Sequence, residues 1–285
     1  MPSPIKIAYI AGCPRSGSTL INRVLGAHPD AVTLGSVKKL KTILRKGQQC
    51  CCGAPTLLEC PFWGKVDAAL AAQHKSLATL RLQTRQNSRF EEDNLALFAA
   101  VQAVTGAQLL IDSSRRSSRL QRLSKMPELN VVPLHLYKTP LAQAGSWKRK
   151  GVTLAQCVFD YWTRNLRILS ACSSDPKAVM LSYEYFCENP TSELTRLTLA
   201  LGLDANPEIL QTWGEQPIHT LGGNRMKFKT SSAIKADEGW REVLGPAEAR
   251  VMQAICGVLW KSMRKRQLTA SARKQSQPAA ETHQP

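Results

Sequence analysis

The most constraining feature of the sequence is a glycine- and serine-rich turn near the N-terminus. Lys6 to Ala11 forms a short, partly β-branched apolar run, which is typical of a buried strand. The turn Gly12-Cys-Pro-Arg-Ser-Gly-Ser-Thr19 follows it, and residues 19–27 then carry apolar side chains at helical spacing. A strand, a loop and a helix in this order gather consecutive backbone N–H groups at a helix N-terminus, so the turn favours a bound phosphate or sulfate.

Short apolar runs of the same kind recur along the chain, and each is followed by a polar turn and a helix-like stretch. They lie at residues 108–112, 131–137 and 178–183. Strands that alternate with helices imply right-handed crossovers and a parallel sheet, with function at the carboxyl ends of the strands. The sequence therefore predicts an α/β protein of the P-loop type, with three layers, α/β/α, around a mostly parallel central sheet.

A helical insertion is expected at about residues 36–104, between the apolar run at residues 6–11 and the run at residues 108–112. It contains two amphipathic stretches, 66–84 and 94–104, and is large enough to build an acceptor pocket. Further helices are expected at 152–169, 192–201 and 248–259. We expect residues 1–266 to form a single domain. Residues 267–285 are rich in Ser, Gln, Ala, Pro and charged residues without an apolar period, which predicts a disordered tail.

The composition narrows the class of partner. Lys and Arg number 38 against 21 Asp and Glu, and the net charge of +17 favours anionic ligands. The sequence has no Cys/His finger spacing, no aromatic RNP-like run and no helix-turn-helix signature, which disfavours nucleic acid as the partner. The longest apolar stretch near the start, residues 5–11, is too short for a membrane span and lacks a signal-peptide cleavage pattern. We expect no transmembrane segment and a cytoplasmic location.

The glycine-rich turn has the spacing of a Walker A loop, G-x-x-x-x-G-K-[ST], but Ser18 stands where the lysine belongs. This difference disfavours an ordinary ATPase or kinase. Arg15 supplies a cation earlier in the turn, and its guanidinium can grip two oxygens of a bound anion. A P-loop phosphotransferase nevertheless remains an alternative, because residues 108–112 resemble a Walker B strand that ends in a magnesium-binding Asp112.

The string Pro14-Arg-Ser-Gly-Ser-Thr-Leu20 resembles the first signature of the bacterial-type sulfotransferases that use 3'-phosphoadenosine 5'-phosphosulfate. The resemblance implies a transferase that moves the sulfuryl group of this co-substrate to a hydroxyl or amine, without a metal. The acceptor would be a small molecule, a carbohydrate or a peptide. The residues implied to hold the 5'-phosphosulfate are Arg15, Ser16, Gly17, Ser18 and Thr19.

Three later segments resemble other elements of the same family. Lys138 and Ser146 are eight positions apart, as in the signature that grips the 3'-phosphate, although a lysine replaces the family's usual arginine. Leu181-Ser-Tyr-Glu-Tyr185 resembles the family's Arg-Tyr-Glu element, which implies that Tyr183 reaches the adenine. The segment from His219 to Phe228 resembles the family's Gly-Asn-x-Met-Arg-Phe loop, which closes over the nucleotide. The residues implied there are Gly223, Asn224, Arg225 and Lys227.

The resemblance also implies part of the catalytic machinery. Arg15 and Arg115, the latter from a run that matches the family's Asp-Ser-Ser-Lys, would stabilise the leaving oxygen. The resemblance does not identify the general base. Related tyrosine-sulfating enzymes use the glutamate of a Gly-Glu pair, and this chain has Gly35-Ser36 at that place. Three alternatives remain: another base, an acceptor that is already nucleophilic, or an inactive or repurposed nucleotide-binding relative. The substitute bases considered are His135, Asp112 and Glu59.

Four of the nine cysteines crowd into the run Cys50-Cys-Cys-Gly-x6-Cys-Pro-Phe-Trp63, which also resembles bacterial members of the family. The thiols of Cys50, Cys52 and Cys60 could ligate zinc or form a disulfide, with Cys51 beside them. Three thiolates with no histidine close by in the sequence make an incomplete tetrahedral set, so we expect a small structural staple and no catalytic zinc.

Overall fold

A parallel sheet forms the centre of the molecule. The computed structural model describes residues 3–83, 88–173, 175–228 and 230–275, without the side chains of residues 225 and 271–275. Within these residues the sheet has five strands, all parallel, in the order β2-β3-β1-β4-β5. The predicted α/β class and parallel sheet are confirmed. The strands are β1 (Ile5–Gly12), β2 (Ala31–Gly35), β3 (Leu109–Arg115), β4 (Leu129–Tyr137) and β5 (Val179–Ser182).

The central strand β1 shows why the sheet is covered on both faces. Alternate side chains of a strand point to opposite faces, and Ile7 and Tyr9 belong to one buried cluster while Ala8 and Ile10 belong to another. All four are fully buried, as expected for a strand that pairs with β3 on one side and β4 on the other. The turn that follows β1 therefore starts from the buried central strand of the sheet.

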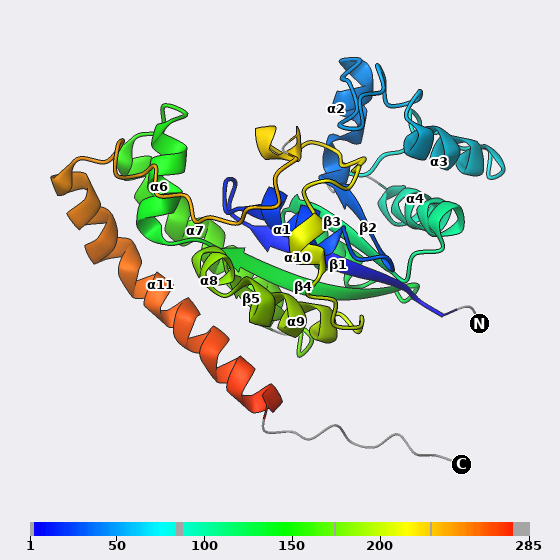
Figure 1. Cartoon of the computed structure of the whole chain (residues 1–285). Helices are drawn as coiled ribbons and strands as arrows, with labels where there is room; N and C mark the ends of the chain where they lie inside the picture. Colours follow the sequence, from blue (N-terminus) through cyan, green and yellow to red (C-terminus); the bar gives the residue numbers. More distant parts are fainter. Residues whose placement is uncertain (1–2, 84–87, 174, 229, 276–285) are drawn as a thin grey trace, which may run out of the picture.

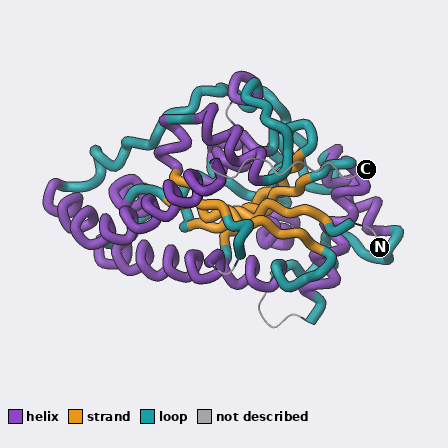
Figure 2. The backbone as a smooth tube through the Cα atoms, turned by 90° about the horizontal axis from the view of Figure 1, so that it is seen from below, coloured by secondary structure: helices purple, strands orange, loops and turns teal. Residues whose placement is uncertain are grey.

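Helices cover the two faces, and Figure 2 shows the strands lying between them. One face packs against α1 (Ser18–Leu25), α8 (Tyr183–Glu188), α9 (Pro190–Ala200) and α10 (Ile209–Thr212). The other packs against α4 (Phe90–Thr105), α5 (Ser117–Leu123) and the C-terminal part of α7 (Leu154–Ser173), and α3 (Pro61–Ala71) packs on α4. The remaining helical elements are η1 (Val37–Lys39), α2 (Leu40–Arg45), α6 (Pro140–Lys148), η2 (Arg225–Phe228) and α11 (Pro246–Gln275).

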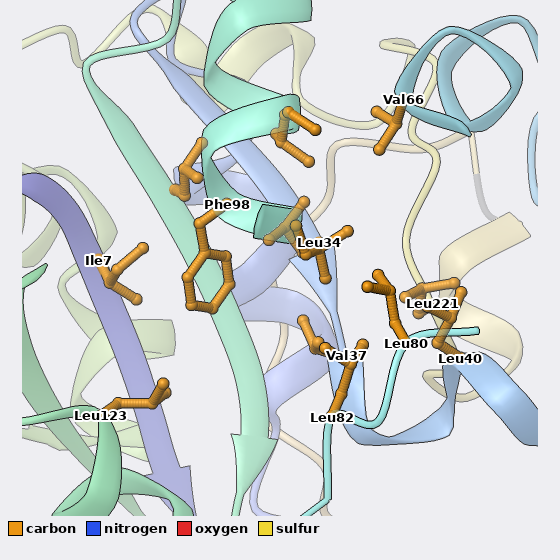
Figure 3. Packing of buried hydrophobic residues seen from close by; sticks show 14 of the residues in the cluster. Ile7, Leu34, Val37, Leu40, Val66, Leu80, Leu82, Phe98, Leu123 and Leu221 are labelled. Carbon is orange, nitrogen blue, oxygen red and sulfur yellow. The ribbon is translucent and has the colours of Figure 1, made fainter. Parts of the chain in front are cut away.

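The segment expected as an insertion contributes to the main core. Figure 3 shows Phe98 of α4 packed near Leu34 of β2, with Val37 and Leu82 beside them. The single helix expected over 66–84 is wrong in extent, because α3 ends at Ala71 and the following chain is irregular. The reason is packing: buried leucines at positions 77, 80 and 82 of this irregular stretch reach the core without a helix.

The C-terminal helix α11 continues past residue 266, where the domain was expected to end and a disordered tail to begin. It runs through Gln275, along the side of the molecule away from α2 and α3 (Figure 1). Gln267 is 2% exposed, and its Oε1 accepts hydrogen bonds from the Tyr137 hydroxyl (2.6 Å) and the Ser182 N–H (3.0 Å). The apolar pattern of the sequence did not predict this buried helical turn, because its buried residue is a hydrogen-bonded glutamine and not an apolar side chain. The expected tail is therefore helical over 267–275, and residues 276–285 lie outside the described residues.

Among the described residues, we find no helix that combines the length and the apolar content needed to cross a bilayer.

Candidate anion-binding site

A cavity of about 300 Å³ lies where the strands of the sheet end. Its lining includes a residue from the carboxyl end of every strand, or from the chain just after it: Arg15, Ser36, Arg115, Lys138 and Tyr183 for β1 to β5 in numerical order. Parallel strands bring these positions to one edge of the sheet, where ligands of open α/β folds bind. The cavity therefore stands where the topology predicts function.

The turn after β1 has a backbone that only a few residue types adopt easily. Gly17, the N-cap of α1, has φ 93°, and a Cβ there would lie 2.2 Å from a ring carbon of Tyr183. Glycine is therefore required both for the left-handed conformation and for the close approach of the ring. Arg15 also has a positive φ, 74°, which is uncommon outside glycine and is typical of functional turns.

Positive side chains gather on the lining. Among the described lining residues, the cations are Arg15, Lys39, Arg115 and Lys138. Burial lowers the pKa of Arg115, and the charge of Arg15 lowers it further. Burial likewise lowers the pKa of Lys39, with Arg115 adding to the effect. An arginine keeps its proton despite such a shift, so these like charges repel one another until an anion neutralises them. The sequence reasoning missed Lys39.

Lys138 and Ser146, the two residues expected at a 3'-phosphate, lie together and share a carboxylate. The Oδ2 atom of Asp237 accepts hydrogen bonds from Lys138 Nζ (3.0 Å), Ser146 Oγ (3.2 Å) and Arg149 Nη2 (3.1 Å). Burial alone would raise the pKa of Asp237, but Lys138 and Arg149 outweigh it and lower the pKa. Asp237 therefore stays ionised and holds the position where a ligand anion would meet Lys138. Nothing in the sequence had pointed to this carboxylate.

Tyr183 joins the two halves of the cavity. Its ring lies against Gly17 on one side, and Lys138 Nζ lies 4.7 Å from the ring centroid, a cation–π contact. The Tyr183 hydroxyl donates to the carbonyl of Lys235 at 3.4 Å, in the segment that also carries Asp237. The residue is 4% exposed, so only a small part of the ring faces the charged cavity.

The loop expected to close over a nucleotide reaches the cavity in part. Gly223 and Asn224 line it, and the Asn224 N–H donates to Thr19 Oγ1 at 3.4 Å. Lys227 does not line it, and its Nζ lies 4.8 Å from the ring centroid of Phe228. The side chain of Arg225 lies outside the described part of the structure.

Of the predicted serine and threonine positions, some line the cavity and one does not. Ser18 and Thr19 line the cavity, whereas Ser16 is buried and does not. Ser36 is also buried but does line it, and within the described residues its Oγ has no hydrogen-bond partner. A buried hydroxyl without a partner is costly, so a ligand that pairs with Ser36 Oγ would gain affinity.

None of the three substitute bases lines the cavity. His135 is fully buried, and burial lowers its pKa to about 4. Asp112 is fully buried as well: its Oδ2 accepts from Arg119 Nε at 2.9 Å and its Oδ1 accepts from the Ser114 N–H at 2.8 Å. Glu59 lies in an exposed turn, where it accepts from Thr56 at 2.7 Å. Because both oxygens of Asp112 are engaged, its geometry argues against the magnesium-binding role of a Walker B aspartate.

The fold and the site together define a three-layer α/β protein with a strongly cationic cavity at the carboxyl edge of its sheet. No protein-family model matches the chain, and no curated protein matches it. Solved structures do match. The sulfotransferase domain from the curacin biosynthetic pathway is 18% identical with a TM-score of 0.57, and the match covers 89% of this chain and 98% of that domain.

Two further solved structures show the same likeness. The sulfotransferase domain of the Synechococcus PCC 7002 olefin synthase is 20% identical with a TM-score of 0.50, and the match covers 89% of this chain and 95% of that one. Sulfotransferase STF9 from Mycobacterium avium is 12% identical with a TM-score of 0.50, and the match covers 92% of this chain and 77% of that one. This chain therefore has the fold of bacterial sulfotransferase domains.

Proposed function

We propose that the chain is a sulfotransferase that takes the sulfuryl group of 3'-phosphoadenosine 5'-phosphosulfate and transfers it to a hydroxyl or an amine. The observation that carries the proposal is that two groups of residues suited to bind anions line one cavity. Arg15 and the turn up to Thr19 form the first, and Lys138 with Ser146 forms the second. A ligand with phosphates at both ends of an adenosine suits two such groups, whereas a nucleoside triphosphate needs one continuous phosphate site.

The residues of the cavity suit the charge changes of this reaction. In sulfuryl transfer the acceptor attacks sulfur in line while the bond to the bridging oxygen breaks and adenosine 3',5'-bisphosphate leaves. Arg15 and Arg115 would stabilise the negative charge that develops on the leaving oxygen, because cations held in fixed positions need no reorganisation. Ser18, Thr19 and the N-terminus of α1 would orient the group that is transferred. Tyr183 lines the cavity, and the exposed part of its ring would contact the adenine.

The general base stays open. Ser36 stands at the expected position of a carboxylate, and a hydroxyl does not act as a base near neutral pH. Burial and the charges of Arg116 and Arg115 lower the pKa of Lys38 to about 8, which leaves part of it neutral at physiological pH. Lys38 does not line the cavity, however, so the present geometry gives it no contact with an acceptor.

The experiment that tests the proposal compares ligands by thermal unfolding. We expect adenosine 3',5'-bisphosphate to raise the melting temperature more than ATP or adenosine 5'-monophosphate does, and equally with and without added magnesium, because side-chain cations neutralise the ligand. A stabilisation by ATP that requires magnesium would instead support a phosphotransferase. A sulfur-labelled donor incubated with a pool of hydroxyl and amine compounds then separates an active enzyme from a nucleotide-binding relative, since only the enzyme yields a labelled product.

Ser36→Ala is expected to change the turnover of sulfuryl transfer by less than about tenfold, which is below about 1.4 kcal/mol in the barrier. The reason is that the Ser36 hydroxyl can pair with a ligand but cannot take its proton. Steady-state rates of labelled-product formation with an identified acceptor measure the effect, and the affinity for adenosine 3',5'-bisphosphate serves as the control for a damaged cavity. A loss of turnover well beyond tenfold at unchanged affinity would assign Ser36 a catalytic role and overturn this expectation.

A further inference from the structure

A second cluster of reactive side chains lies outside the lining of the cavity, where the cysteine-rich segment meets the loop at His219. The Sγ atoms of Cys50, Cys52 and Cys60 and a ring nitrogen of His219 all lie within 4.8 Å of one another. The Sγ of Cys60 is 3.5 Å from that of Cys50, 3.7 Å from that of Cys52 and 3.1 Å from His219 Nδ1. The histidine that the sequence pattern lacked is thus supplied from 159 residues away along the chain.

The four atoms are close enough together to surround one small ion. With zinc–sulfur bonds of about 2.3 Å, two sulfur ligands of a tetrahedral site lie about 3.8 Å apart, and a sulfur and a nitrogen ligand lie about 3.6 Å apart. The observed Sγ–Sγ distances from Cys60 fall close to the first value. The 3.1 Å between Cys60 Sγ and His219 Nδ1 is shorter than the second, so these two ligands would move slightly apart around the ion. A disulfide would need about 2 Å between sulfurs, so neither pair has that geometry.

From this geometry we propose that Cys50, Cys52, Cys60 and His219 form a structural zinc site. Four protein ligands leave no open coordination position, which is the arrangement of structural rather than catalytic zinc. Cys50 and Cys60 are buried, so they could be thiolates only with a cation beside them. The neighbouring Cys51 is not part of the set, because its Sγ lies 2.8 Å from the carbonyl oxygen of Ile218, to which it donates.

The surroundings hold the ligands in place. The imidazole of His219 stacks on Phe62, with ring centroids 5.2 Å apart and the planes inclined by 19°. The Trp63 indole N–H donates to the His219 carbonyl at 2.6 Å. Backbone hydrogen bonds between Cys50 and Ala54 and from Gly53 to Cys50 close the turn that carries two of the thiols. Outer contacts of this kind fix the orientation of metal ligands.

Such a site would fasten two distant parts of the chain. Residues 50–60 precede α3, whereas the chain after His219 pairs with β2 through Leu221 and continues to Gly223 and Asn224 at the cavity wall. The zinc would therefore support the wall of the cavity without touching a ligand in it. The proposal concerns metal binding alone and holds or fails independently of nucleotide binding and of sulfuryl transfer.

Metal content of the full chain tests the proposal directly. We expect the protein, purified under reducing conditions from zinc-supplemented cells, to contain one zinc per chain and to release it when its thiols are modified with a mercurial. Replacement of the zinc by Co²⁺ should give thiolate-to-cobalt charge-transfer bands together with the d–d bands of a tetrahedral site. Protein with clearly less than one zinc per chain, or Co²⁺ that binds without thiolate bands, would overturn the proposal whether or not any variant folds.

Matched variants identify the ligands. Cys60→Ser and His219→Phe should lose the metal, the latter while keeping a ring against Phe62. His219→Cys should keep it, because a thiolate can replace the imidazole. Cys51→Ser is the control from the same turn and should bind zinc as the unsubstituted protein does. Loss of zinc in Cys51→Ser, full retention in Cys60→Ser, or a disulfide at Cys60 found by mass spectrometry of the reduced preparation would each contradict the assigned set.

Discussion

Lys138→Met is expected to weaken the binding of adenosine 3',5'-bisphosphate by about 1.5 to 3 kcal/mol, the range for a hydrogen bond to a charged group, which is roughly a ten- to hundredfold loss of affinity. Lys138 is 3% exposed, so little water can take the place of its ammonium group. Methionine keeps the length of the side chain beside the Tyr183 ring and removes only the charge. Isothermal titration with the two nucleotides, adenosine 3',5'-bisphosphate and adenosine 5'-monophosphate, measures the effect.

Adenosine 5'-monophosphate is the internal control, because it lacks the phosphate that Lys138 is proposed to meet. Its affinity should hardly change in Lys138→Met, whereas Arg15→Ala should weaken both nucleotides. Arg149→Met adds a matched variant, since Arg149 also pairs with Asp237 but is about one-third exposed, and its loss should cost less than the loss of Lys138. Equal losses for the two nucleotides in Lys138→Met would refute a separate 3'-phosphate site and leave only an anion site at the turn after β1.

Arg119→Met is expected to lower the free energy of unfolding by about 3 to 5 kcal/mol, the usual loss when one partner of a buried ion pair is removed. Arg119 is 1% exposed and donates from Nε to Asp112, from Nη1 to the Leu82 carbonyl (2.5 Å) and from Nη2 to Asn94 Oδ1 (2.5 Å). Without the guanidinium, the fully buried carboxylate of Asp112 has lost its counter-charge. Urea unfolding followed by circular dichroism measures the change.

Arg122→Met is the control on the same helix. Arg122 pairs with Glu91 at the surface and lies over the same Phe90 ring as Arg119 does, so the variant removes a similar side chain from a solvated pair. Its expected cost is below about 1 kcal/mol. Similar losses for Arg119→Met and Arg122→Met would show that Asp112 is not held in a buried ion pair, and would reopen its assignment as a magnesium ligand.

The parts of the fold that could be predicted are those specified by local chemistry. The strand, turn and helix from residue 5 to residue 25 follow from an apolar run, a left-handed glycine and helical spacing, and they agree with β1 and α1. The later strands β3, β4 and β5 could be read in the same way. The short edge strand β2 (Ala31–Gly35) was missed, since five residues with mixed polarity carry no clear period.

The parts of the site that were missed depend on tertiary proximity. Arg15, Lys138 and Tyr183 could be predicted as site residues, because each lies in a short sequence motif that directly follows a predicted strand. Asp237 lies 99 residues from its partner Lys138 in an irregular segment, and no periodicity or motif marks it. His219 was read only as part of a nucleotide loop, and its neighbourhood with Cys60 exists only in the folded chain.

The carboxylate of Asp237 has a consequence for the kinetics of ligand exchange. A dianionic 3'-phosphate bound as proposed would have to displace the Asp237 carboxylate from Lys138 and Ser146, and the carboxylate could return when the phosphate departs. In such an exchange the buried ammonium group of Lys138 would never be left without a counter-charge, a state that is costly in a medium of low polarity. The proposed site would therefore bind its ligand less tightly and exchange it faster, because Asp237 would compete with the phosphate for Lys138 and Ser146.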